Sequence, residues 1–251
     1  MNKPVVFISH ISEEKEMAVL LKKLIEDSFL GMLEVFVSSN ENSVSKGSRW
    51  LDEITDALGK CEIELILCSP KSVRRPWINF EAGAGWIRTI PVIPLCHSGL
   101  KPSELPIPLN LLQAIEISEL SSLKWIFPVL AESIKANTPK VELDEFVQDM
   151  KRLEQKYTFW DKVNIVLKEF NEKYGNIFNS LKKGNLLIEL EETDIKKLQE
   201  ILDFFIQNGY ITIRRTGGTS IMSGGVFHKV EIRTTDTYRS LFDNKSCNFY
   251  N

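Results

Sequence analysis

The stretch Ile63-Glu64-Leu65-Ile66-Leu67-Cys68 is apolar apart from Glu64, and Pro70 follows it closely. A short apolar run that ends at a turn-forming residue is typical of a strand buried on both faces of a sheet. Four similar runs lie on either side of this one, at residues 5–9, 34–38, 90–96 and 114–118. Because segments with helical spacing separate several of these runs, the first half of the chain predicts an α/β fold, a parallel sheet covered by helices on both faces.

Helices are expected between the predicted strands. Ser12 can cap a helix that carries acidic residues in its first turn, where the helix dipole favours them. Ser48 precedes a second apolar stripe, and Pro76 suits the first position of a third helix, since an N–H at that position would have no intrahelical partner. A fourth helix is expected over residues 122–135, with a kink or interruption at Pro128.

The character of the sequence changes after Asn137-Thr138-Pro139-Lys140, which we interpret as a linker between a domain at residues 1–137 and a domain at residues 141–251. In the second domain we expect helices at residues 143–157, at 161–174 and from Thr193 or Asp194 to Asn208-Gly209, and strands at 210–215 and 226–233. Helices followed by such a ribbon predict a winged-helix-like module. The Gly-rich connection at residues 216–225 would form its wing or a disordered ribbon tip.

The charge balance gives no general attraction to nucleic acid or anionic lipid. The chain of 251 residues has 31 Lys and Arg against 34 Asp and Glu, a formal net charge of −3. From residue 141 onward, 16 basic residues stand against 17 acidic ones, and no basic run is longer than two residues. Since nucleic-acid binding needs a basic patch that releases counterions, direct nucleic-acid binding is not expected, and protein contact or dimerisation is the better interpretation of the second domain.

Cysteine and histidine usage predicts a reduced protein without a metal site. The cysteines Cys61, Cys68, Cys96 and Cys247 form no C-x-x-C pair, and the three histidines have no suitably spaced ligand companions. The N-terminus lacks the apolar segment of a signal peptide, and no uncharged apolar run is long enough to span a membrane. We therefore expect a cytoplasmic protein without membrane association.

The densest cluster of chemically unusual residues is Pro76-Trp77-Ile78-Asn79-Phe80-Glu81-Ala82-Gly83-Ala84-Gly85-Trp86. On a helix, Trp77 and Glu81 lie one turn apart, so that an aromatic ring and a carboxylate share one side of the helix. This helix would start just beyond the carboxyl end of a strand, at the edge where open α/β sheets bind their ligands. An aromatic ring with a carboxylate beside it can hold a flat cationic group.

Residues 5 to about 118 resemble a bacterial TIR (Toll/interleukin-1 receptor) domain. The resemblance rests on the order and spacing of the motifs Val6-Phe7-Ile8-Ser9-His10, Lys46-Gly47-Ser48-Arg49-Trp50, Leu67-Cys68-Ser69-Pro70 and Trp77-x-x-x-Glu81. It implies a flavodoxin-like fold with a five-stranded parallel sheet, and an enzyme that breaks the nicotinamide–ribose bond of NAD+. It also implies that Glu81 is the catalytic residue.

The resemblance further implies a binding pocket for NAD+, which would be the substrate, with no separate cofactor. Phe7, Ser9 and Ser12 match positions near this pocket, and Trp77 matches an aromatic residue that lines it. Lys46 either contacts the phosphates of NAD+ or belongs to an assembly interface, and the sequence does not separate these two roles.

Cleavage of NAD+ makes specific chemical demands on such a site. Positive charge builds on the ribose in an oxocarbenium-like transition state, and a nearby carboxylate stabilises it electrostatically or by brief covalent bonding. Nicotinamide leaves as a neutral molecule from a cationic ring, so no general acid is required. One carboxylate, that of Glu81, is therefore sufficient, and His10 at a strand end is not expected to act as a base.

Three functions are open on the sequence. The first is an NAD+ glycohydrolase that releases nicotinamide and ADP-ribose or a cyclised product, as an effector of bacterial antiphage immunity. The second is a non-catalytic TIR scaffold that signals by assembly, and the third is a synthase of a cyclic ADP-ribose messenger.

The resemblance implies self-association in which the loop at residues 39–48 contacts a neighbouring TIR subunit. The C-terminal domain would respond to a regulatory protein or a small-molecule signal.

Overall fold

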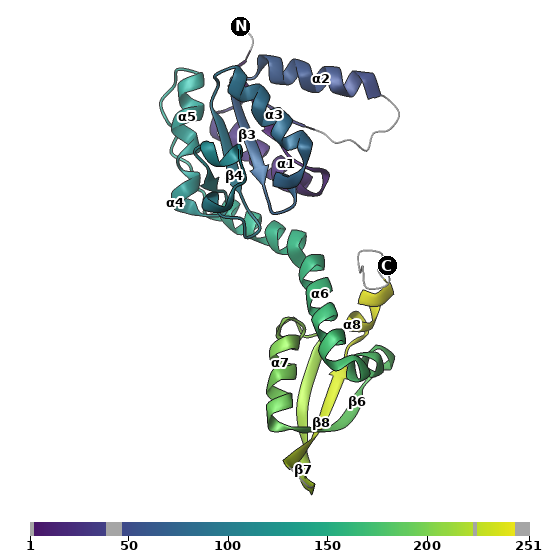
Figure 1. The fold of residues 1–251 in the computed structure, drawn as a ribbon. Coiled ribbons are helices and arrows are strands. Elements are labelled where there is room, and N and C mark those ends of the chain that lie inside the picture. Colours follow the sequence, from purple (N-terminus) through teal and green to yellow (C-terminus); the bar gives the residue numbers. More distant parts are fainter. Residues whose placement is uncertain (1–2, 39–46, 223–224, 244–251) are drawn as a thin grey trace. The chain divides into compact units, whose positions relative to one another are not determined.

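The computed structural model describes residues 3–38, 47–222 and 225–243, with the backbone alone at residues 47–51, 222, 225 and 243. The chain forms two compact units, Met1–Tyr157 and Thr158–Asn251. The first unit is built on a parallel sheet and the second on an antiparallel sheet (Figure 1). In the part of the chain that the structure describes, we find no helix with the length and apolar character needed to cross a membrane.

The sheet of the first unit has five strands in the order β2-β1-β3-β4-β5, and all neighbouring strands are parallel. The strands are β1 (Val5–Ser9), β2 (Glu34–Val37), β3 (Ile63–Cys68), β4 (Val92–Cys96) and β5 (Ile115–Glu116). Every residue of β3 is buried, as a central strand between two layers of helices requires. The predicted flavodoxin-like α/β fold is confirmed, and the carboxyl ends of the strands meet at one edge of the sheet.

Helices cover both faces of this sheet (Figure 1). They are η1 (Ser12–Glu14), α1 (Lys15–Ser28), α2 (Gly47–Lys60), η2 (Ser72–Arg74), α3 (Pro76–Ile87), η3 (Pro102–Glu104), η4 (Leu109–Leu111), α4 (Leu120–Leu123) and α5 (Ile126–Ser133). On one face, α1 and α5 pack against Val6 and Ile8 of β1. Phe7 of β1 points to the opposite face and packs against α2. Glu64 of β3 lies beside Phe7 in the sheet register, so its side chain also points toward the α2 and α3 layer.

The fourth predicted helix, residues 122–135, is wrong in its details. The segment forms the two helices α4 and α5, and the interruption falls at Lys124 and Trp125, not at Pro128. Pro128 lies in the first turn of α5, where a missing N–H breaks no intrahelical hydrogen bond. The proline is therefore compatible with the helix that it was expected to interrupt.

The first unit extends beyond the predicted linker at residues 137–140, and the two units divide after Tyr157. Apolar side chains at and just before the start of α6 (Asp144–Lys183) belong to the core on the α1 face of the sheet. These side chains are Leu143, Phe146, Val147 and Met150. The beginning of α6 is thus part of the first unit because it completes the core of that unit.

Helix α6 replaces the two separate helices predicted at residues 143–157 and 161–174. Residues 158–160, which separate the predicted helices, continue the helix. Its backbone leaves helical dihedral angles at Tyr174, where φ is −136° and ψ is 45°. The end predicted for the second helix therefore coincides with a kink within α6.

The second unit contains the remainder of α6, then β6 (Leu186–Glu191), α7 (Glu192–Gln207), β7 (Ile211–Met222), β8 (Gly225–Thr234), α8 (Asp236–Ser240) and η5 (Leu241–Asp243). Its antiparallel sheet has the order β6-β8-β7. Its separate core combines aliphatic side chains with aromatic rings that pack edge to face, among them Phe170 against Phe178 and Phe205 against Tyr238. The helix predicted from Thr193 or Asp194 is present as α7, and the two strands predicted for the ribbon are present as β7 and β8. The winged-helix assignment stays a prediction.

The sheet of the second unit differs from the prediction in two ways. Strand β6 was not predicted, and the Gly-rich segment predicted as a loop lies largely inside β7, which continues to Met222. The pairing of β7 with β8 changes register between Arg215 and Thr219. Gly217 and Gly218 in this interval have φ values of +87° and +91°, which glycine adopts without strain. The prediction of a loop is wrong for residues 216–222, and residues 223–224 lie outside the described residues.

Candidate active site

Glu81 lies on the inner side of α3 and has a fully buried side chain. The indole Nε1 of Trp77, one helical turn earlier, donates a hydrogen bond of 2.7 Å to Oε1 of Glu81. The hydroxyl of Ser9, the last residue of β1, donates to Oε2 of Glu81. Each carboxylate oxygen thus accepts a hydrogen bond, and hydrogen bonds of this kind stabilise the charged form of a carboxylate.

The fold brings these three residues together for simple geometric reasons. Ser9 ends the interior strand β1 at the carboxyl edge of the sheet, and its side chain is on the same face as Phe7 because the two residues are two positions apart. Helix α3 starts after β3 and covers that face. The half-buried ring of Trp77 stacks on that of Phe80, with ring centroids 5.2 Å apart. The predicted juxtaposition of ring and carboxylate on one side of α3 is present.

A second buried carboxyl group, that of Glu64 on β3, lies close to Glu81. Burial, and next the charge of Glu81, raise the pKa of Glu64 to about 9, while the guanidinium of Arg88 acts in the opposite direction. Glu64 is therefore neutral at pH 7. Neither of its carboxyl oxygens has a hydrogen-bond partner among the described residues. The sequence offered one signal for Glu64, because it is an acidic residue in an otherwise apolar strand. It gave no indication that Glu64 lies near Glu81.

Gly85 makes room for the carboxyl group of Glu64. A Cβ atom at Gly85 would lie 2.2 Å from Oε2 of Glu64 and 2.6 Å from Cγ2 of Val92. Gly85 is one turn beyond Glu81 on the same buried side of α3. The helix thus places the carboxylate of Glu81 and the space for Glu64 on neighbouring turns.

A separate buried network that the sequence did not predict lies at the same edge of the sheet. Oε1 of Glu14 is 3.1 Å from Nε2 of His97 and accepts a hydrogen bond of 2.7 Å from the hydroxyl of Ser69, while Oε2 accepts one of 3.2 Å from the backbone N–H of Ile11. The hydroxyl of Tyr157 on α6 is 3.0 Å from that of Ser69. Glu14 was expected in the first turn of a helix, and its buried side chain is the centre of this network.

The remaining residues predicted for the NAD+ pocket have different environments. Phe7 is fully buried and stacks on Phe36, with ring centroids 5.5 Å apart, while Ser12 is half-buried at the start of η1. Lys46 and the greater part of the loop at residues 39–48 lie outside the described residues. The structure therefore brings Ser9, Trp77 and Glu81 into direct contact and places Phe7 beneath them in the core.

His10 follows Ser9 and is also buried. Its Nδ1 is 3.1 Å from the hydroxyl of Ser38, which follows β2. Burial lowers the pKa of His10 to about 4, so the ring is neutral at pH 7. Among the described residues Nε2 has no hydrogen-bond partner.

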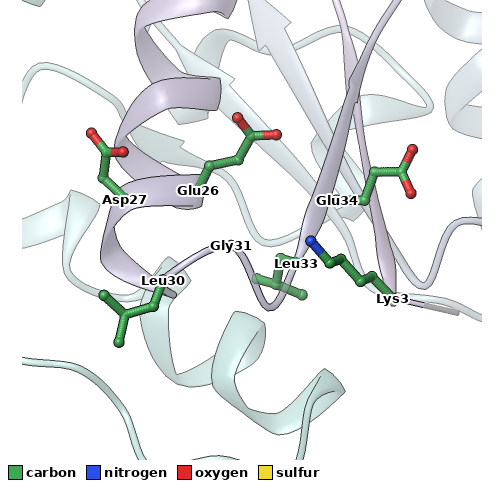
Figure 2. A pocket seen from close by; sticks show the side chains of 7 residues that line it. All are labelled: Lys3, Glu26, Asp27, Leu30, Gly31, Leu33 and Glu34. Atoms are coloured by element: carbon green, nitrogen blue, oxygen red, sulfur yellow. The ribbon is translucent and has the colours of Figure 1, made fainter. Parts of the chain in front are cut away.

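A hollow of about 580 Å³ lies at the opposite edge of the sheet (Figure 2). Figure 2 shows that its lining includes the acidic side chains of Glu26, Asp27 and Glu34 and the amino group of Lys3. These residues surround the amino ends of β1 and β2, whereas Ser9 and Glu81 are at the carboxyl ends. The hollow is therefore not the site that contains Glu81.

The cysteines that the structure describes lie in the core of the first unit. Cys61, Cys68 and Cys96 are buried free thiols, and Cys247 lies outside the described residues. Burial raises the pKa of Cys61 to about 11 and that of Cys96 to about 12. These thiols are protonated at pH 7, so they lack the thiolate character of reactive cysteines.

The strand order, the helix layers and the Trp77–Glu81 pair at the carboxyl edge define a single-sheet α/β domain of the flavodoxin-like class. The family described as "TIR domain" matches residues 6–140, which is more than half of the chain. The protein therefore belongs to the TIR-domain family. The second unit, Thr158–Asn251, lies outside the matched residues. A comparison of the chain with curated proteins gave no match.

Proposed function

We propose that this protein is a TIR-type NAD+ glycohydrolase that releases nicotinamide and ADP-ribose or a cyclised product. The observation that carries the proposal is the buried carboxylate of Glu81, which accepts hydrogen bonds from Trp77 and Ser9 at the carboxyl edge of the sheet. Membership of a family that includes such enzymes supports it.

In the proposed reaction, Glu81 faces the ribose of NAD+ and stabilises the positive charge that builds there as the bond to nicotinamide breaks. The ring of Trp77 lines the pocket for the flat cationic nicotinamide ring, whose charge an aromatic face attracts. Ser9 keeps the carboxylate oriented by its hydrogen bond. The leaving group departs neutral, so the site needs no second carboxyl group as a general acid.

We propose further that the described conformation is a resting state. Glu81 has no exposed surface, and both of its oxygens accept hydrogen bonds from protein groups. NAD+ can reach the carboxylate only after a rearrangement, and the half-buried Trp77 is the part of the enclosure nearest to solvent. Self-association of TIR domains, or a regulatory protein or small signal that acts on the second unit, would drive that rearrangement. An NAD+-consuming effector of antiphage defence has to be silent until it is triggered.

The test compares nicotinamide release by the full-length wild type with release by Glu81→Gln, under crowding and at high protein concentration so that assembly can occur. Glu132→Gln is the matched control, since Glu132 is an exposed glutamate on α5. Release by the wild type and the control, with a loss of about 100-fold or more in Glu81→Gln, supports the proposal. Product chromatography then separates linear from cyclic ADP-ribose and so tests the messenger synthase.

A non-catalytic scaffold is the second candidate, and one observation favours it. The outer side of α3 exposes Phe80, Trp86 and Ile87, which are 61%, 49% and 83% exposed. Exposed apolar side chains gathered on one helix are suited to protein contact. If the protein is a scaffold, Glu81→Gln leaves its self-association unchanged and neither form releases nicotinamide.

A further inference from the structure

Glu64 and Glu81 form a pair of buried carboxyl groups with different surroundings. Glu81 accepts hydrogen bonds from Ser9 and Trp77, whereas neither oxygen of Glu64 has a partner among the described residues. Both side chains have no exposed surface. Two neighbouring carboxyl groups in one buried space cannot both ionise readily, because their like charges repel and water is excluded.

The surroundings decide which of the two carries the charge. Donated hydrogen bonds stabilise a carboxylate, so the charge belongs on Glu81, and the proton belongs on Glu64, which has no donor. The other charged or titratable groups that act on Glu64 are Arg88, just beyond α3, and Cys61, just before β3. Arg88 donates a hydrogen bond of 2.7 Å to the backbone carbonyl of Cys61, not to Glu64.

The helix is built to keep this carboxyl group in place. Gly85 leaves the space in which Oε2 of Glu64 lies, since any larger residue there would have its Cβ atom within 2.2 Å of that oxygen. An acidic side chain inside the central strand, without a hydrogen-bond partner, is costly for folding. The other side chains of β3 are apolar and fit the buried strand without this cost. The fold itself therefore does not require a carboxyl group in β3.

We propose that Glu64 is a neutral neighbour of the Glu81 site that leaves Glu81 as the single charge there, and that a charge on Glu64 disturbs the hydrogen bond between Glu81 and Trp77. The part of this inference that concerns catalysis rests on the proposed function. Its physical content, the coupling of Glu64 to the Trp77–Glu81 bond, can be measured without NAD+.

The first experiment follows the indole N–H resonance of Trp77 by ¹H–¹⁵N NMR in the full chain between pH 7 and pH 10, with Trp77→Phe to assign the signal. In the wild type we expect the resonance to shift with an apparent pKa near 9, the value to which Glu64 is raised. In Glu64→Gln, or in Glu64→Leu if the glutamine variant fails to fold, we expect no shift in this range. Cys61→Ser should retain the shift, since the pKa of Cys61 lies higher, at about 11.

The second experiment measures the pH profile of nicotinamide release. We expect Glu64→Gln to be as active as the wild type at pH 7, because a neutral amide replaces a neutral carboxyl group of the same shape. Wild-type activity should fall about tenfold by pH 10, as ionisation of one group with a pKa of about 9 predicts, and Glu64→Gln should lack this decline.

The outcomes separate the inference from the function on which it rests. A Trp77 resonance that does not shift in the wild type, or that shifts equally in Glu64→Gln, overturns the role of Glu64 whether or not NAD+ is cleaved. A loss of activity at pH 7 in a folded Glu64→Gln variant also overturns it. A shift that depends on Glu64 supports the coupling, and if the wild type then releases no nicotinamide, the proposed function alone is wrong.

Discussion

The indole N–H of Trp77 points at the carboxylate of Glu81, at 2.7 Å, from one turn earlier on α3. The two residues of the Trp-x-x-x-Glu motif are thus joined by a direct hydrogen bond, because residues four apart on a helix are neighbours on its surface. The ring also stacks on that of Phe80, so the indole contacts both an exposed aromatic residue and a buried carboxylate. The motif therefore links the surface of the helix to the interior of the site.

Trp77→Phe removes the donor and keeps an aromatic ring at the position. We expect the variant to lower the free energy of unfolding by about 1–3 kcal/mol, because a buried carboxylate loses a hydrogen bond. Chemical denaturation followed by circular dichroism measures this change. The control is Trp125→Phe, since Trp125 is 72% exposed, and its effect should stay within about 0.5 kcal/mol. Equal effects of the two substitutions would show that the Trp77 bond does not stabilise the fold.

Gly85→Ala and Gly83→Ala form a matched pair on the same helix. A Cβ atom at Gly85 meets both Glu64 and Val92, whereas one at Gly83 meets nothing within 4 Å. We expect Gly85→Ala to destabilise the protein by about 1–3 kcal/mol through overpacking. Gly83→Ala should stabilise it by up to about 1 kcal/mol, because alanine is the better helix former. Thermal unfolding of both variants decides this, and a stabilised Gly85→Ala variant would contradict the described packing of Glu64.

Glu64 should make the stability of the protein depend on pH. The unfolded carboxyl group has a pKa near its ordinary value of 4.5, and the folded one is raised to about 9. As the pH rises from 4.5 to 9, the unfolded state loses this proton while the folded state keeps it, so the free energy of unfolding falls, by up to about 1.4 kcal/mol per pH unit. The stabilising effect of the proton is complete below pH 4.5 and lost above pH 9.

Glu64→Gln cannot lose a proton, so it should be more stable than the wild type at pH 8, with a difference that grows between pH 5 and pH 9. Urea unfolding at a series of pH values gives this difference directly. The control is Glu132→Gln on the exposed side of α5, for which the difference from the wild type should stay constant over the same range. A constant difference for Glu64→Gln as well would mean that Glu64 is already ionised at neutral pH.

Much of the first unit could be predicted because its strands are buried on both faces. The bounds of β1 and β3 agree with the apolar runs at residues 5–9 and 63–68, and Pro76 begins α3 as expected. Each of these runs indicates a strand through residues that are neighbours in the sequence, so it can be recognised without knowledge of the fold. The motif Trp77-x-x-x-Glu81 is equally local, since both residues lie on one helix, and it predicted a ring beside a carboxylate.

The parts that the sequence did not predict depend on contacts between distant segments. Glu14 has the local features of a solvated first-turn residue, and its burial depends on His97 and Ser69. Glu64 was visible as an acidic residue in an apolar strand, but its place beside Glu81 depends on how α3 packs on β3. No pattern within one element contains that information.

The second unit was harder to predict for a related reason. The alternating residues of β6 run directly into α7, so no turn signal separates strand from helix. The glycines at residues 217 and 218 are typical of loops, yet here they allow a register change within the β7–β8 pair. Their backbone angles are compatible with a loop and with a register change inside a strand. The pairing with β8 decides which of the two structures forms.

The most direct test of the central claim compares two substitutions of the same kind in the same buried space. Nicotinamide release is measured at pH 7 for the full-length wild type, for Glu81→Gln and for Glu64→Gln, after folding of each has been verified. The account predicts that Glu81→Gln loses activity by about 100-fold or more, since it removes the charge that stabilises the transition state, and that Glu64→Gln keeps wild-type activity. Full activity in Glu81→Gln would contradict the claim that the carboxylate held by Trp77 and Ser9 performs the reaction.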